Sequence, residues 1–206
     1  MIKTCATVND RYKYVYFEVL KNASRSLLIS FGFKSKSLPG ARAVEGHEGS
    51  TTVSHYQFKN CLLPDDTKQY YKFGFCRNPW ARAYSCWKNG KGPKTLSGDQ
   101  FQEFQEFLHV LKDKDVLTCG DKHILAQNAQ LPQDINFIGR IENIDNDLKK
   151  IYSAIKCEYT QLKHSNKTQT EKSDINTYYR KYYGKEEQML ISEIYHVDIE
   201  RFEYKF

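Results

Sequence analysis

The chain has 206 residues, of which 40% are hydrophobic and 14% aromatic, and its formal net charge is +6. This length suits one domain with a sizeable core, and the composition excludes a globally disordered chain. No apolar run approaches the roughly 20 residues of a membrane-spanning helix, and the N-terminal stretch has no apolar signal core. We therefore expect a single soluble domain over residues 1–206, located in the cytoplasm. The positive charge is compatible with an anionic ligand.

The first half of the chain contains two strand-like stretches. Residues 13–19 are β-branched and aromatic, which is the composition of a buried strand, and an apolar helix-like stretch follows at 27–33. Residues 34–52 are rich in Lys, Ser and Gly and predict a long loop. A second strand is predicted at 71–76, and the sequence after Pro79 is typical of a helix.

Helical patterns dominate the second half. Residues 97–100 match a capping box ahead of apolar residues at helical spacing over 101–111. A short strand is predicted at 135–138, followed by the clearest helix at 144–155. A last helix is predicted from about residue 185 to residue 202. Strands that alternate with helices predict an α/β domain with a mainly parallel central sheet.

The cysteines do not indicate a metal site or a disulfide framework. No CxxC pair or tight Cys/His cluster occurs, so zinc is not expected. Without an export signal, free thiols are expected. Cys76 and Cys86 lie among apolar residues and are predicted to be small core side chains. The six cysteines are Cys5, Cys61, Cys76, Cys86, Cys119 and Cys157.

The turn after the first strand carries groups that suit a phosphate or a sulfate. Lys21 supplies a mobile cation, Ser24 and Ser26 supply hydroxyls, and such a turn exposes backbone N–H groups. The stretch is not a Walker A sequence, because GxxxxGK[ST] is absent and Lys21 stands at the start of the turn. A plain connection with Lys21 and Arg25 facing solvent is the alternative.

A second candidate anion site follows the second strand. Arg77 ends that strand beside a helix start, where its guanidinium can bind a phosphate through two parallel hydrogen bonds. Ser85 lies two turns along the following helix and can donate to the same group. Arg82 can instead pair with an acidic residue or cap another element. Trp80 and Trp87 are expected in the core.

Together the two segments resemble motifs of the sulfotransferases that use 3′-phosphoadenosine-5′-phosphosulfate (PAPS). The closest similarity is to sulfotransferase family 2, which contains carbohydrate 2-O-sulfotransferase-like and chondroitin-type enzymes. Residues 20–26 resemble the motif PK-x-[GA]-x-[TR]-S, with Leu20 in place of Pro. Residues 77–87 meet R-[ND]-P-[WY]-x-R-x-x-S-x-[WY] in full. Residues 137–148 resemble F-[IV]-G-R-x-E-x-x-x-x-D-L, and residues 195–204 resemble the closing Y-x-x-D-x-x-x-F-x-Y stretch.

The resemblance covers roughly residues 12–206 and implies a P-loop-like, three-layer α/β/α sulfotransferase domain with PAPS as co-substrate. Arg77 and Ser85 are then expected to hold the 3′-phosphate, which distinguishes this donor from ATP. Lys167, in the loop at 163–168, is a further candidate for contact with the nucleotide. The residues expected to cradle the 5′-phosphosulfate are Lys21, Asn22, Ala23, Ser24, Arg25 and Ser26.

In-line sulfuryl transfer to an acceptor hydroxyl needs a base and a stabilising cation. Lys21 is expected to stabilise the bridging oxygen as it departs. Histidine is the natural base near neutral pH, and His55 precedes Arg77 by 22 residues, a place similar to that of a catalytic histidine in the resembling enzymes. His47 and Glu48 are the rival bases. No metal is expected, because Lys and Arg can carry the charge that magnesium neutralises in kinases.

Two other function classes stay open. A P-loop nucleotide kinase shares the strand-loop-helix arrangement but should show GK[ST] and an acidic magnesium ligand. A non-catalytic binder of polyanions or nucleotides should show clustered Lys and Arg with exposed aromatics, whereas the arginines here lie singly at strand ends. For the acceptor a sugar hydroxyl is the leading candidate, and an aromatic hydroxyl is the alternative. Neither nucleic acid nor a membrane is an expected partner.

Overall fold

The computed structural model describes residues 3–31, 53–59, 65–160, 162 and 177–206. The chain divides into two compact units, and each is considered by itself. The sheet unit comprises Lys3–Cys76 and Gln130–Gln169, and the helical unit comprises Met1–Ile2, Arg77–Ala129 and Thr170–Phe206. The expectation of a single domain stays a prediction. Among the described residues, no helix has the length and apolar character needed to cross a membrane.

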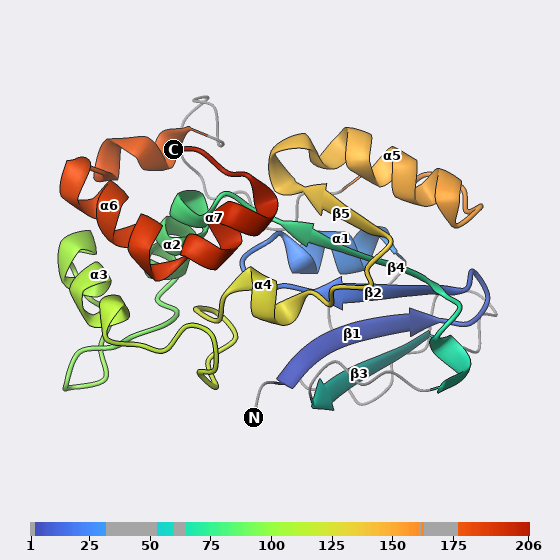
Figure 1. Cartoon of the computed structure of the whole chain (residues 1–206), viewed down its shortest axis with the longest axis horizontal. Helices are drawn as coiled ribbons and strands as arrows, with labels where there is room; N and C mark the ends of the chain where they lie inside the picture. The colour runs from blue at the N-terminus through green and yellow to red at the C-terminus, as the bar shows by residue number, and fades with distance from the viewer. Residues whose placement is uncertain (1–2, 32–52, 60–64, 161, 163–176) are drawn as a thin grey trace. The chain divides into compact units, whose positions relative to one another are not determined.

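The sheet unit is built on a five-stranded sheet in the order β3–β1–β2–β4–β5 (Figure 1). Strands β2, β4 and β5 run parallel to one another, whereas β1 is antiparallel to β2 and to β3. The α/β class is confirmed, as are the two strands predicted around residues 13–19 and 71–76. The strands are β1 (Lys3–Asn9), β2 (Tyr14–Glu18), β3 (Val53–Lys59), β4 (Tyr71–Cys76) and β5 (Phe137–Arg140).

Two helices of the sheet unit cover the same face of the sheet. Helix α1 (Ser24–Ser30) follows β2, and helix α5 (Ile144–Ala154) follows β5. Leu27 of α1 and Ile151 of α5 belong to one buried core with Tyr16 and Phe73 of the strands. The two helices therefore pack on this one face, and the clearest predicted helix is confirmed. Two short 3-10 helices complete the unit, namely η2 (Asp65–Thr67) and η3 (Ile141–Asn143).

The opposite face of the sheet is approached by the chain that precedes β5. Gly74 alternates with Phe73 along β4 and so points to this face. A Cβ atom at Gly74 would lie 2.4 Å from the Cδ2 atom of Leu131 and 3.5 Å from the Cδ1 atom of Ile135. This close approach requires a glycine. The P-loop-like, three-layer arrangement as a whole stays a prediction.

The helical unit packs its helices around aromatic side chains. Trp80 and Trp87 are both buried, as expected from the sequence, and Tyr183 and Tyr195 are buried with them. Figure 1 draws α2 and α3 in green and the C-terminal helices in red. The helices are α2 (Pro79–Lys88), α3 (Phe104–Lys112), η4 (Tyr178–Tyr182), α6 (Lys185–Ile194) and α7 (His196–Phe202), together with α4 (Gln127–Gln130), whose last residue belongs to the sheet unit.

The capping box predicted at residues 97–100 is wrong. The hydroxyl of Ser97 donates to Oδ2 of Asp99 at 2.7 Å, and the Asp99 N–H donates to Oγ1 of Thr95 at 3.0 Å. These bonds close a local turn, because short polar side chains compete with helix formation by bonding to nearby backbone. Helix α3 begins only at Phe104, after Glu103 as its N-cap residue.

The last predicted helix is also two helices rather than one. Helix α6 ends at Ile194 and α7 begins at His196. Between them Tyr195 has φ −113° and ψ 30°, outside the helical range. Its side chain is buried, and its hydroxyl donates to the backbone oxygen of Ile124 at 2.8 Å. The break therefore accompanies a long-range contact that helical periodicity does not reveal.

Candidate functional site

The predicted site residues divide between the two units. Lys21–Ser26 belong to the sheet unit, and Arg77 and Ser85 belong to the helical unit. The backbone of His55 lies in β3. The remaining candidates lie outside the described residues, namely Lys167 with the loop at 163–168, His47 and Glu48.

The turn between β2 and α1 holds two non-glycine residues in the left-handed region. Lys21 has φ 71° and Ala23 has φ 53°. Such a conformation costs a non-glycine residue about 1–3 kcal/mol and persists only where the surroundings impose it. The N–H of Asn22, between them, donates to the backbone oxygen of Val19 at 3.3 Å. Backbone strain of this kind often occurs at functional sites, and here two strained residues stand one residue apart in the turn where the sequence predicted an anion site.

A buried side chain ties the turn to the neighbouring strand. Asn22 is 1% exposed, and its Nδ2 donates to the backbone oxygen of Phe75 in β4 at 2.7 Å. Because β2 and β4 are parallel neighbours, with Phe17 opposite Gly74, both strands end at the same edge of the sheet. Open α/β sheets bind ligands at this carboxyl edge. The turn is thus fixed in the place where a ligand site is expected.

The start of α1 is suited to an anion. Ala23 is the N-cap residue and provides no side-chain cap, and the first turn contains no acidic residue. Lys21 is partly exposed and Arg25 is exposed, so two cations lie near these backbone N–H groups. Negative charge is favoured at such a position, both by the N–H groups and by the helix dipole. The local chemistry therefore fits the sulfate or phosphate that the sequence predicted.

One side chain holds the backbone of Arg77 on both sides. The Arg77 N–H donates to Oε1 of Gln127 at 2.9 Å, and Nε2 of Gln127 donates to the Arg77 backbone oxygen at 2.8 Å. Asp198 in turn accepts from the N–H groups of Gln127 at 2.9 Å and of Asn128 at 2.7 Å. Gln127 and Asp198 are both fully buried. This hydrogen-bonded chain fixes the backbone from which the Arg77 guanidinium extends.

Sequence reasoning missed Gln127 and gave Asp198 no role of its own. Asp198 lies in the closing stretch that resembles a family motif, and that was its only signal. Gln127 belongs to no recognised motif, and 50 residues separate it from Arg77. Burial raises the pKa of Asp198, although the Arg82 charge and the hydrogen bonds it accepts act in the opposite direction.

The residues that follow Arg77 build the start of α2. Oδ1 of Asn78 accepts from the N–H groups of Trp80 at 3.1 Å and Ala81 at 3.2 Å, which is an N-cap. Nδ2 of Asn78 donates to the backbone oxygen of Lys205 at 3.1 Å. Pro79 occupies the first helical position, where its missing N–H has no cost. The Asn-Pro pair of the motif is therefore structural and sets where the helix begins.

Arg82 has a structural role, which was one of the roles that the sequence left open. The side chain is 2% exposed, and its Nη2 donates to the backbone oxygens of His123 at 3.1 Å and Leu125 at 2.9 Å. The guanidinium therefore anchors the segment before α4. Ser85, one turn further along α2, is partly exposed, which is compatible with the predicted ligand contact.

The segment around β5 is scaffold as well. Oδ2 of Asp147 accepts from the Arg140 N–H at 2.9 Å, and Oδ1 of Asp147 accepts from Nδ2 of Asn143 at 3.1 Å. Asp147 is 5% exposed and also pairs with Lys150 at 3.0 Å. These contacts join the end of β5 to the first turns of α5. In the motif at residues 137–148, the Arg140 backbone and Asp147 therefore have a structural role.

The backbone of His55 is placed by strand pairing. His55 is opposite Thr7 of β1, and Thr7 is opposite Tyr16 of β2. Neighbouring strands lie about 4.8 Å apart, so the His55 backbone is roughly 10 Å from that of Tyr16. Among the described residues, no group of three or more His, Cys, Asp or Glu side chains could hold a metal ion.

Comparison with known proteins gives one match. The family model described as "Sulfotransferase family" matches residues 5–205. No curated protein and no solved structure matches the chain significantly. The family match spans both units, including the turn at Lys21–Ser26 and the Arg77 segment. The chain therefore belongs to the sulfotransferase family.

Proposed function

We propose that the protein transfers a sulfuryl group from PAPS to an acceptor hydroxyl, with a sugar hydroxyl as the leading candidate. Membership of the sulfotransferase family supports sulfuryl transfer in general. The observation that carries the donor assignment is the turn between β2 and α1. Its two left-handed residues, Lys21 and Ala23, present a basic, uncapped helix start at the carboxyl edge of the sheet.

The turn binds the 5′-phosphosulfate in this proposal. The residues Lys21–Ser26 surround the anion with backbone N–H groups, hydroxyls and cations. During transfer the acceptor oxygen bonds to sulfur while the bond from sulfur to the bridging oxygen breaks. The Lys21 ammonium stabilises the negative charge that remains on the phosphate. A cation held in place before the reaction lowers the barrier without reorganisation.

The other phosphate of the donor is assigned to the Arg77 segment. Arg77 binds the 3′-phosphate through its planar guanidinium, and Ser85 donates to the same group. The two hydrogen bonds between the Gln127 side chain and the Arg77 backbone support this role, because they reduce the conformational freedom lost on binding. Lys167 is proposed as a further contact to the nucleotide.

Titration calorimetry with adenosine 3′,5′-bisphosphate and with ATP tests the donor assignment. We expect the bisphosphate to bind more tightly, and we expect Lys21→Met and Arg77→Gln each to weaken its binding. Lys91→Met, a change at an exposed lysine beyond α2, is the matched control and should bind as the wild type does. Preference for ATP would favour a kinase, and equal weak binding of both would favour a non-catalytic polyanion binder.

The general base is proposed to be His55, with His47 and Glu48 as the rivals. A general base typically contributes about 10²–10⁴-fold to the rate. We therefore expect His55→Ala to lose transfer by a factor in that range and to keep bisphosphate binding. The variants His47→Ala and Glu48→Gln are assayed beside it with radiolabelled donor. Full turnover in His55→Ala, with loss in one of the others, would move the base to that residue.

A further inference from the structure

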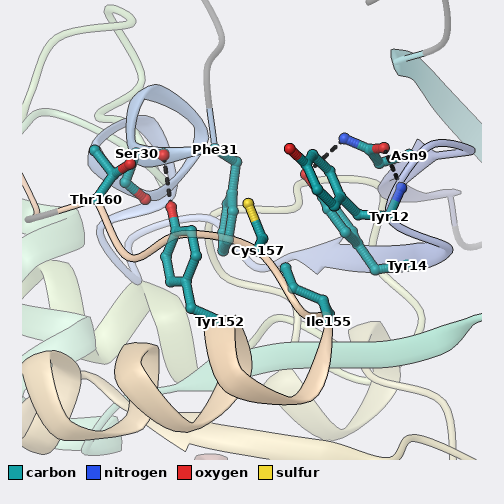
Figure 2. Close-up of a pocket in the computed structure, with 9 residues that line it drawn as sticks. All are labelled: Asn9, Tyr12, Tyr14, Ser30, Phe31, Tyr152, Ile155, Cys157 and Thr160. Carbon is teal, nitrogen blue, oxygen red and sulfur yellow. Dashed lines mark hydrogen bonds between the residues drawn. The ribbon is translucent and has the colours of Figure 1, made fainter.

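A pocket of about 170 Å³ lies in the sheet unit, away from the donor turn (Figure 2). It is lined by the end of β1, the hairpin into β2, the last residues of α1 and the end of α5. Tyr14, which begins β2, is part of its wall, whereas Lys21 follows the other end of that strand. The pocket therefore lies at the amino edge of the parallel strands.

The length of α1 separates this pocket from the donor turn. The helix starts at Ser24 beside the turn and ends at Ser30, whose side chain lines the pocket together with Phe31. A seven-residue helix spans roughly 10 Å. Ligands of α/β sheets usually bind at the carboxyl edge, so the pocket is a second site rather than an extension of the first.

Four of the nine residues that line the pocket are aromatic. The ring of Phe31 stacks on Tyr152, with centroids 5.4 Å apart and planes at 24°, and lies 5.7 Å from the ring of Tyr14. Ile155 adds an aliphatic side chain that is 5% exposed. An apolar cavity of about 150 Å³ is large enough to hold benzene. The volume and the walls thus suit a single planar ring.

Polar groups at the pocket are held in place by hydrogen bonds. Nδ2 of Asn9 donates to the Tyr14 hydroxyl at 3.4 Å, and its Oδ1 accepts from the Tyr12 N–H at 3.0 Å. The Tyr152 hydroxyl donates to the backbone oxygen of Ser30 at 2.6 Å. Figure 2 shows these bonds on opposite sides of the pocket. A ligand with one hydroxyl therefore meets preorganised polar partners beside an apolar wall.

The described residues that line the pocket carry no charge. Among them there is no Asp, Glu, Lys, Arg or His. Burial raises the pKa of Tyr14 and raises that of Tyr152 to about 12, and the contact with Cys157 raises the pKa of Tyr12. All three hydroxyls therefore stay protonated at neutral pH. A phosphate or sulfate would lose its hydration here without gaining a counter-charge, which excludes the ligand class proposed for the donor turn.

We propose that this pocket binds a small, neutral, planar aromatic alcohol of about the size of phenol. The stacked Phe31 and Tyr152 rings provide the flat wall, and the polar groups of Asn9 and Ser30 lie beside it. Cys157 lies between Phe31 and Tyr12 in Figure 2, so a bound ring covers its thiol. The site is independent of the sulfotransferase activity.

Protection of Cys157 from alkylation tests the proposal on the unmodified protein. Peptide mass spectrometry follows the labelling of each cysteine by iodoacetamide as phenol is titrated. We expect phenol to slow Cys157 labelling saturably, by at least fivefold, and to leave Cys119 unchanged. Cys119 is partly exposed in the helical unit and is the internal control. Equal slowing at both cysteines, or none at Cys157, would overturn the proposal.

Ligand-observed NMR supplies a second readout that does not need a reactive thiol. We expect phenol to give saturation-transfer signals, cyclohexanol to give weaker ones because it is not planar, and benzenesulfonate to give none because it is charged. Cys157→Phe, which places a ring in the pocket, should abolish the phenol signal, and Cys157→Ser should retain it. Excess adenosine 3′,5′-bisphosphate should not displace phenol. Undiminished signals in a folded Cys157→Phe protein, or equal signals from benzenesulfonate, would refute the assignment.

Discussion

Gly139 of β5 has no room for a side chain. A Cβ atom there would lie 2.5 Å from Cε1 and 2.8 Å from Cδ1 of the Phe75 ring, which is itself 1% exposed. Overpacking of a buried site typically costs about 1–3 kcal/mol. We expect Gly139→Ala to lower the free energy of unfolding by that amount in urea titrations. Gly120→Ala is the control, because a Cβ atom there meets nothing within 4 Å. Equal stability of the two variants would contradict the packing argument.

Asp198 makes the stability of the helical unit depend on pH. Its folded pKa is raised by burial above the unfolded value of about 3.9. The folded state then binds the proton more tightly, so this group's contribution to stability is largest below pH 4 and is lost as the pH rises through the folded pKa.

We expect the free energy of unfolding of Asp198→Asn to depend less on pH in this range, as measured by urea titrations at several pH values. The variant should also lose about 1–3 kcal/mol, because the amide cannot accept from both N–H groups that the carboxylate binds. Asp113→Asn, at an exposed position after α3, is the control. An unchanged pH profile in Asp198→Asn would show that another group causes the dependence.

At the scale of elements, the start of α2 depends on one side chain. Asn78 caps the helix through Oδ1, and loss of an N-cap costs about 0.5–2 kcal/mol. We expect Asn78→Ala to show a loss in that range by thermal or urea unfolding. Asn78→Asp keeps the acceptor and should lose less. Equal losses in both variants would mean that the bond to Lys205, rather than the cap, carries the effect.

The elements also show which patterns could be predicted. Strands β2 and β4 are mainly apolar and aromatic, apart from Glu18 and Lys72, and their composition predicted them. Strands β1 and β3 contain Lys, Thr, Asn and Gln among their apolar residues. Their extended backbone is stabilised by pairing, of β1 with β2 and β3, and of β3 with β1. Because the pairing of β1 with β3 joins segments far apart in the sequence, local propensity does not reveal it.

At the scale of the whole molecule, the net charge is +6, and the two proposed ligands differ in their own charge. Adenosine 3′,5′-bisphosphate is anionic, so salt should screen its attraction to the basic turn and to Arg77. We expect its dissociation constant to rise several-fold between about 0.05 M and about 0.5 M salt, as measured by calorimetry. Binding of neutral phenol should not weaken over the same range. A salt-independent bisphosphate affinity would contradict the proposed ionic contacts.

The sequence alone determined the sulfotransferase family and the two segments proposed to bind the donor. This was possible because the motif residues at 20–26 and 77–87 are contiguous, so their spacing is visible without a fold. The tertiary structure decided that Arg82 is a structural residue, that Gln127 holds Arg77, and that a neutral pocket lies at the amino edge of the sheet. These features depend on contacts across the chain, such as the bond from Tyr152 to Ser30, 122 residues apart. Only folding brings such residues together.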